Sequence, residues 1–300
     1  MNHWVVHWFL IDRDGIALTD IEQFHLKVFS KYHDFIMANI DKITISFAKT
    51  SKTSPELISL IERTLSFLFS GKKIEFQIRD NNQKVGEFET FRDNVLCNIG
   101  SNEKILYTHI KGVYRINAVP MILKKELIWI WNMYKVVFSS QSLESLDEFI
   151  MAGPDFSIYD TAFNTIKTKR WNPIAHIYKT YIKPLTINLE KDNSNDLIKR
   201  FIELLPNDAN NKLPWAYLGT FYWINASTLE SYLNSIGFSK EDIVSIAGEF
   251  QKYDRPSTLN NATTNLNGNV VKMTFANNVS EYFLPSIVEM KRCSFFKFKD

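Results

Sequence analysis

Short apolar runs alternate with amphipathic segments through the first 110 residues. The apolar runs are rich in β-branched residues and predict strands at residues 4–11, 42–48, 73–78 and 104–110. Between them, apolar positions recur at helical spacing and predict helices at residues 20–38, 54–70 and 86–99. Strands that alternate with helices are typical of βαβ units, so we expect an α/β fold with a mainly parallel sheet.

Capping residues indicate where the first helices begin and end. Asp20 is expected to cap the first helix, and Ser54 the second, with Pro55 at its first helical position. Gly71 follows that second helix, where glycine commonly ends a helix.

The second half of the chain is less regular. Apolar spacing predicts helices at residues 121–138, 142–149, 196–205 and 227–235, and a strand-like run at residues 215–225. Residues 151–154 (MAGP) break the pattern, and residues 260–269, rich in Asn, Thr and Gly, are typical of an exposed loop. We find no internal repeat.

The composition is that of an ordinary globular chain, with 45% hydrophobic residues among 300. A net charge of +2 offers little to neutralise phosphates and argues against nucleic-acid binding. Cys97 and Cys293 are too few and too far apart for a disulfide framework or a metal cluster. The start of the chain lacks a signal-peptide pattern, and no apolar run approaches the roughly 20 residues of a membrane span, so we expect a cytoplasmic protein.

Several motifs that would assign an activity are absent from the sequence. It contains no Gly-x-Gly-x-x-Gly after the first strand, no Gly-x-x-x-x-Gly-Lys-Ser/Thr, no Gly-x-Ser-x-Gly, no His-Glu-x-x-His and no Cys-x-x-Cys. These absences argue against four classes: a dinucleotide-binding oxidoreductase, a P-loop NTPase, an α/β-hydrolase and a structural zinc protein.

The fourth predicted strand ends in the most informative segment. Ligands of parallel sheets bind outside the carboxyl ends of the strands. At this end His109 and Lys111 share one face by strand periodicity, and Gly112 follows. An imidazole beside an ammonium suits an anion such as a pyrophosphate, and Gly112 permits close approach of a ligand. A solvated strand end is the alternative.

Four segments resemble a known family. Residues 86–91 (GEFETF), 107–113 (YTHIKGV) and 218–225 (LGTFYWIN), with a weaker fourth at 280–284 (SEYFL), resemble bacterial glycosyltransferase-like proteins of capsule and surface-polysaccharide clusters. That family implies the GT-A fold, a Rossmann-type mixed, mainly parallel sheet flanked by helices in a single large domain. Residues 1–115 would be its nucleotide-sugar-binding half and residues 116–300 its acceptor-binding half.

The resemblance implies transfer of a sugar from a nucleotide-sugar donor to a glycan or lipid-linked glycan acceptor. GT-A enzymes usually carry an Asp-x-Asp motif where this chain has His109-Ile110-Lys111. That motif binds a divalent metal, which neutralises the leaving nucleoside diphosphate. A lysine can supply this stabilisation instead, so we expect no metal and no other cofactor; a metal bound by His109 is the less favoured alternative.

The resemblance also assigns positions around the two substrates. The donor-binding set is Asp80, Asn81, Glu87, His109, Lys111, Gly112 and Gly219, and the acceptor-binding set is Tyr222 and Trp223. For Glu87 the alternative is an acid in the first turn of a helix, favoured by the helix dipole. For the aromatic run around Tyr222 and Trp223 the alternative is core packing, because alternate side chains of a strand point to opposite faces.

An inverting transfer needs a base that deprotonates the acceptor hydroxyl. The family resemblance places such a carboxylate at Glu281, which we rank first. Asp155, which follows Gly153-Pro154, ranks second. A surface acid on a C-terminal helix is the alternative for Glu281.

Residues 291–300 interleave Phe with Lys and Arg, a composition that suits peripheral contact with the inner face of a membrane.

Two other functions stay open. One is a non-catalytic nucleotide- or glycan-binding protein of the same fold, for which loss of the Asp-x-Asp pair is the best support. The other is an unrelated α/β nucleotidyl- or phosphotransferase.

Overall fold

The fold is known from a computed structural model. It describes residues 1–10, 15–80, 87–110, 120–155, 195–205, 221–253, 257–258, 263–264, 270–271, 274–275 and 278–296.

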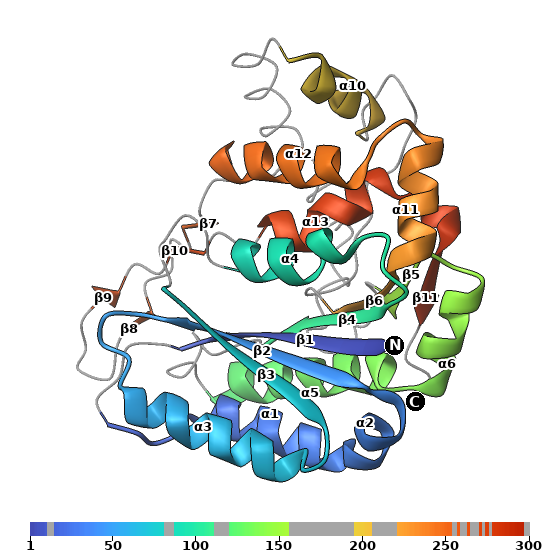
Figure 1. The fold of residues 1–300 in the computed structure, drawn as a ribbon. Helices are drawn as coiled ribbons and strands as arrows, with labels where there is room; N and C mark the ends of the chain where they lie inside the picture. The colour runs from blue at the N-terminus through green and yellow to red at the C-terminus, as the bar shows by residue number, and fades with distance from the viewer. Residues whose placement is uncertain are drawn as a thin grey trace.

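Seven strands form one sheet in the order β11-β5-β6-β4-β1-β2-β3 (Figure 1). The strands are β1 Asn2–Phe9, β2 Lys42–Lys49, β3 Lys73–Asp80, β4 Lys104–His109, β5 Met151–Pro154, β6 Tyr222–Asn225 and β11 Cys293–Phe296. Strand β6 is antiparallel to both its neighbours, and the other neighbouring pairs are parallel. The α/β class and the mixed, mainly parallel sheet of a single domain are therefore as the sequence predicts.

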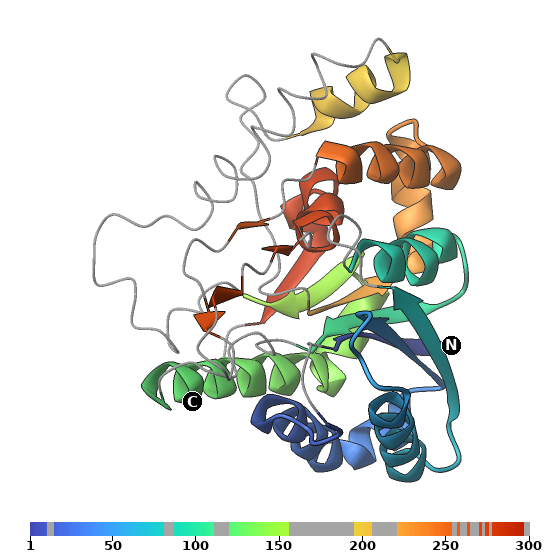
Figure 2. The ribbon, with the colours of Figure 1, turned by 90° about the vertical axis from the view of Figure 1, so that its left-hand side faces the viewer.

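Helices cover both faces of this sheet (Figures 1 and 2). One face carries α1 Asp20–Lys31, α2 His33–Asn39, α3 Pro55–Leu68, α5 Pro120–Val137 and α6 Ser140–Glu144. On the other side lie α4 Phe88–Asn94, α11 Ala226–Ser235 and α13 Asn278–Ile287, with α12 Lys240–Tyr253 stacked beyond α4 and α13 and α10 Asp196–Leu204 beyond α12. Short 3-10 turns are η1 Leu96–Asn98, η3 Ser145–Asp147 and η7 Met290–Arg292, and two small antiparallel pairs join β7 Ser257–Thr258 to β10 Thr274–Phe275 and β8 Thr263–Thr264 to β9 Val270–Val271.

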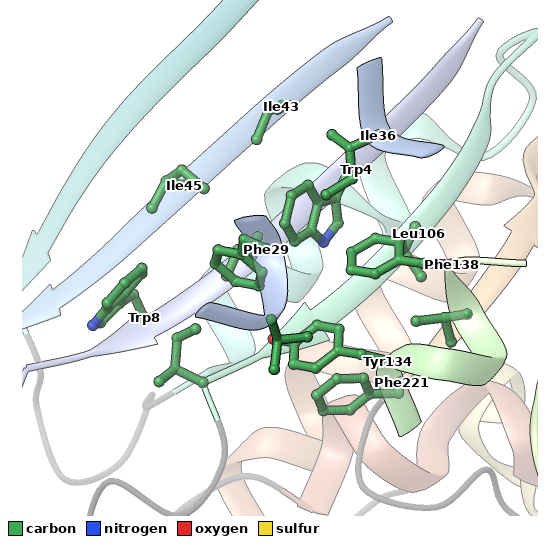
Figure 3. Packing of buried hydrophobic residues seen from close by; sticks show 14 of the residues in the cluster. Trp4, Trp8, Phe29, Ile36, Ile43, Ile45, Leu106, Tyr134, Phe138 and Phe221 are labelled. Carbon is green, nitrogen blue, oxygen red and sulfur yellow. The ribbon is translucent and has the colours of Figure 1, made fainter. Parts of the chain in front are cut away.

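Aromatic rings fill the layer between the sheet and the first helix set (Figure 3). Trp4 lies at its centre, with edge-on contacts to Phe29 at 4.9 Å and to Phe138 at 5.1 Å between ring centroids. Each such pair stabilises the fold by about 0.5–1.5 kcal/mol beyond the area it buries. A second aromatic group, Phe201, Phe250 and Phe283, joins α10, α12 and α13 on the other side. Each face of the sheet therefore has its own hydrophobic core.

The helix starts test the capping predictions. Ser54 does cap α3, with its side chain accepting from the backbone of Leu57 and Pro55 at the first position. The prediction of Asp20 as the first cap was wrong: Thr19 is the N-cap and forms a capping box with Glu22. The single helix expected at residues 20–38 is two, because the chain leaves helical geometry at Tyr32, whose ring packs against Trp131 and Phe138.

Other predicted elements differ in extent. The helix expected at residues 86–99 is α4 followed by η1, and the one at residues 142–149 is α6 followed by η3. Residues 151–154 are not a break but the fully buried strand β5, with Pro154 at its end beside Phe296 of the edge strand β11. Met151 and Ala152 pair with β6, and all four residues pair with β11, so pairing holds the Gly-Pro segment extended, which local composition does not reveal. Of the run at 215–225, β6 occupies the last four residues, and 215–220 lie outside the described residues.

The chain order of the strands reverses beside β1. From β1 the chain adds β2 and β3 on one side, then crosses to place β4 on the other. In such sheets ligands bind outside the carboxyl ends of the two strands that flank this reversal. Figure 2 views the molecule from the side on which β1 and β4 end. Among the described residues, no helix combines the length and apolarity needed to cross a membrane.

Candidate functional site

A row of polar residues crosses four neighbouring parallel strands near their carboxyl ends. His109 of β4 is in register with His7 of β1, His7 with Ser46 of β2, and Ser46 with Gln77 of β3. We call these four residues the polar row. Residues in register on neighbouring strands share a face of the sheet, and this one faces α4. The row therefore spans the reversal between β1 and β4.

Helix α4 and the residue before it cover the row with three polar side chains. Glu87, Thr90 and Asn94 are three and four residues apart, which places them on one side of a helix. All three are buried. Their contacts follow the row in order: Glu87 bonds His109, Thr90 bonds His7 and Ser46, and Asn94 exchanges two hydrogen bonds with Gln77. Side-chain hydrogen bonds thus join the start and body of α4 to all four residues of the polar row.

His109 and Glu87 form a short, buried contact. The Nδ1 atom of His109 lies 2.7 Å from Oε2 of Glu87, and both residues are buried, Glu87 completely. A carboxylate only accepts, so Nδ1 carries the proton. The other ring nitrogen, Nε2, is buried and has no hydrogen-bond partner among the residues that the structure describes. A carboxylate-oriented imidazole with a free nitrogen can bind a ligand or move a proton.

The neighbouring imidazole, His7, is held differently. Its Nδ1 lies 3.0 Å from the hydroxyl of Thr90 rather than from a carboxylate. Burial lowers the pKa of His7 from 6.5 to about 4; attraction from Glu87 opposes this, while His109 and Arg79 lower the pKa further. His7 is therefore neutral at pH 7, and its ring is a hydrogen-bonding group and not a charge.

Arg79 fixes the outer side of the network. Its Nε donates to Ser46 at 3.1 Å, and its guanidinium nitrogens reach Asp93 at 2.7 Å and the side-chain oxygen of Gln77 at 2.9 Å. The Arg79 and Arg92 guanidiniums lower the pKa of Asp93 against the opposing effect of burial. Arg79 therefore has its charge balanced within the fold and acts here by orienting Ser46.

The expectation that the site binds no divalent metal stays a prediction. No group of three His, Cys, Asp or Glu side chains lies close enough to hold one in the described part of the chain. An Asp-x-Asp motif would stand at the end of β4, where the described residue is His109. The carboxylate of Glu87 contacts Nδ1 of His109, on the other side of the ring from Nε2.

The structure brings some donor-binding candidates together and separates others. Glu87 and His109 are in direct contact. Asp80 ends β3 at the same edge of the sheet, but three strand spacings from His109, about 14 Å. Its side chain is 90% exposed and lies 3.4 Å from Lys49. The candidates Asn81, Lys111, Gly112 and Gly219 lie outside the described residues.

The two acceptor-binding candidates are core residues in this structure. Tyr222 and Trp223 are fully buried on β6, on opposite faces of the sheet. The indole of Trp223 donates to the backbone oxygen of Val137 at 2.7 Å. Neither ring offers a face to an acceptor sugar, so this placement corrects the stacking role that the resemblance implies and favours packing.

The two candidate bases lie in different surroundings. Asp155 directly follows β5, and its backbone amide donates to Phe296 at 3.0 Å. Because β5 and β4 point the same way, the half-buried Asp155 is at the same edge of the sheet as His109. Glu281 lies in α13, which packs against α4 and α12; its side chain lies outside the described residues.

Part of the proposed membrane-contacting segment belongs to the fold. Phe295 and Phe296 lie in the edge strand β11 and pack against the cores on the two faces of the sheet. Residues 297–300 lie outside the described residues. The two rings are thus engaged in packing, which weakens their use as membrane anchors.

Sequence reasoning missed His7, Ser46 and Thr90. Two signals were present: His3 and His7 share one face of an otherwise apolar strand, and Glu87, Thr90 and Asn94 repeat at helical spacing. Neither signal shows that the two sets meet, because register is a property of the folded sheet. No protein-family model matches the chain, and no curated protein sequence matches it significantly.

Proposed function

We propose that the chain is a glycosyltransferase of GT-A-like fold, which binds a nucleotide sugar at the carboxyl ends of β1 and β4. The observation that carries the proposal is the His109–Glu87 pair, whose free Nε2 lies beside the strand reversal. The strand order 3-2-1-4 of the first half is the order with which the doubly wound nucleotide-binding sheet begins, and this supports a nucleotide as the ligand. The acceptor would be a glycan or lipid-linked glycan of surface-polysaccharide synthesis.

In this reaction His109 stabilises the leaving nucleoside diphosphate. When the ring carries a second proton, Glu87 balances its charge and the Nε2–H donates to a phosphate oxygen. A hydrogen-bond donor that is already in place before the reaction stabilises developing negative charge without reorganising. Lys111, two residues further along the chain, adds positive charge, and the reaction needs no metal.

An inverting transfer further requires the base. We keep Glu281 first and Asp155 second; the position of Asp155 at the edge of the sheet that carries His109 supports its candidacy. Glu281→Gln should lower turnover by roughly 10²–10⁴ while donor binding persists. If Asp155→Asn has this effect and Glu281→Gln does not, the order of the two is reversed.

The test begins with a thermal-shift screen against UDP, GDP, CMP and their sugar conjugates, because a ligand that binds only the folded state raises its melting temperature. Turnover of the best donor is then measured with and without EDTA, and we expect no loss. His109→Ala should weaken diphosphate binding by about 1.5–3 kcal/mol, the scale of a charged hydrogen bond. His33→Ala, at a partly exposed ring far from β4 in the sequence, is its control. Failure of every nucleotide to bind would refute the proposal.

A second candidate function is a non-catalytic nucleotide-binding protein of the same fold. The burial of Tyr222 and Trp223 favours it, because it removes the acceptor platform that the resemblance implies. Release of nucleoside diphosphate from a bound nucleotide sugar, in the presence of an acceptor extract, separates the two. Transfer of a nucleotidyl or phosphoryl group would instead indicate the nucleotidyl- or phosphotransferase.

A further inference from the structure

The hydrogen bonds behind His7 have a defined direction. Arg79 can only donate, and its Nε–H donates to the hydroxyl oxygen of Ser46 at 3.1 Å. Thr90 also donates to that oxygen, at 2.8 Å. Ser46 thus accepts two hydrogen bonds, and the single hydroxyl proton of Thr90 is committed to it.

This direction sets the tautomer of His7. With its proton on Ser46, Thr90 can only accept from the ring, so Nδ1 of His7 carries a proton and donates across 3.0 Å. The neutral ring then has its lone pair on Nε2. Among the described residues, nothing hydrogen-bonds to this nitrogen. His7 therefore presents a bare acceptor next to His109.

We propose that Nε2 of His7 accepts a hydrogen bond from a hydroxyl group of the bound nucleotide sugar, while the neighbouring His109 binds its diphosphate. This inference rests on the proposed function. A phosphate oxygen is itself an acceptor and is repelled at His7, whereas a hydroxyl donates. Of the in-register pair, His7 thus binds the hydroxyl-bearing part of the ligand and His109 the anionic part. His7 selects against ligands that lack the hydroxyl.

The first experiment reads the tautomer of His7 in the unaltered protein. Long-range ¹H–¹⁵N correlation on protein labelled at histidine, assigned with His7→Asn, should give the Nδ1–H form from pH 6 to 8. Thr90→Val, which removes the acceptor, should abolish that preference. An Nε2–H tautomer or a charged ring in the unaltered protein overturns the inference. If His7→Asn fails to fold, sequential assignment of the unaltered protein identifies the His7 ring instead.

The second experiment compares three probes by calorimetry: inorganic pyrophosphate, UDP and UDP-glucose, or GDP and GDP-mannose if those bind better. His7→Asn keeps a group that can contact Thr90 and removes Nε2. We expect binding of the hydroxyl-bearing probes to fall about threefold to tenfold, the scale of one neutral hydrogen bond, and pyrophosphate binding to stay unchanged.

The pattern across the probes identifies the hydroxyl. Equal weakening of the nucleoside diphosphate and the nucleotide sugar places it on the ribose, and weakening of the nucleotide sugar only places it on the transferred sugar. Equal effects on all three probes, or no effect, overturn the inference while leaving the proposed function standing. If no nucleotide binds the unaltered protein, the proposed function itself has failed and takes the inference with it.

Discussion

The two faces of strand β1 are both buried, yet they have opposite chemistry. Trp4 and Trp8 point into the aromatic layer below the sheet, where they pack without exposure. His3 and His7 point to the other face, where each ring bonds polar side chains. Burial therefore does not distinguish the apolar face from the face of the candidate site; the presence of defined polar partners does.

The energetics of the two faces also differ. Apolar burial is non-directional and tolerates many arrangements of similar volume. Buried polar groups are costly unless each is hydrogen-bonded, so the polar face admits few arrangements. Four substitutions or titrations test this contrast, from the largest expected effect to the smallest.

Trp4→Ala should have the largest effect, because Trp4 is fully buried and packs edge-on against Phe29, Phe69 and Phe138. We expect a loss of about 3–5 kcal/mol in the free energy of unfolding, measured by urea denaturation. Phe67→Ala, at a side chain that is 87% exposed, is the control and should change it by less than about 0.5 kcal/mol. Similar losses for both variants would contradict a stabilising role for the aromatic layer.

Lowering the pH should destabilise the polar face through His7. Folding lowers its pKa from 6.5 to about 4, so its contribution is complete above pH 6.5 and is lost as the pH falls towards 4. The shift corresponds to roughly 3 kcal/mol. Urea denaturation of the unaltered protein and of His7→Asn from pH 4 to 7 isolates this contribution, with His33→Asn, at a partly exposed ring, as control. Parallel pH profiles for the unaltered protein and His7→Asn would show that burial does not hold His7 neutral.

Ser46→Ala removes the oxygen shared by Arg79 and Thr90 without changing the shape of the strand. The expected cost in unfolding free energy is about 1–3 kcal/mol, because the Thr90 hydroxyl loses its acceptor in a buried place. Ser66→Ala on the exposed side of α3 is matched in chemistry and should be nearly neutral. A neutral Ser46→Ala would indicate that the network is not coupled to stability.

Asp80→Ala should have the smallest effect. Its ion pair with Lys49 is on the surface, and such pairs contribute less than about 1 kcal/mol. The melting temperatures of Asp80→Ala and the unaltered protein are compared at 0.05 and 0.5 M salt. Their difference should be small at low salt and nearly vanish at high salt. Asp80 also lies far along the edge from His109, so a large loss of nucleotide affinity in this variant would extend the site across β1 and β2.

Much of the fold follows from the sequence by itself. The period-two apolar runs determined the four parallel strands β1 to β4, and helical spacing with Ser54-Pro55 determined α3, because these signals are local and strong. His109 and Glu87 were identified as site candidates from segments 22 residues apart. The Gly-Pro strand β5 and the break at Tyr32 could not be found this way, because contacts distant in sequence override local preference there.

Only the tertiary structure decided what these residues do together. Sequence periodicity determines which side chains of one strand share a face, but not which residue of the next strand lies beside them. Strand register set His7 next to His109, and the docking of α4 set Glu87 and Thr90 on the two rings. Hydrogen bonds link Arg79, Ser46, Thr90 and His7, which come from four segments of the chain. Their donor and acceptor roles are set only when these segments meet, because each hydroxyl has one proton to donate and its neighbours determine the acceptor.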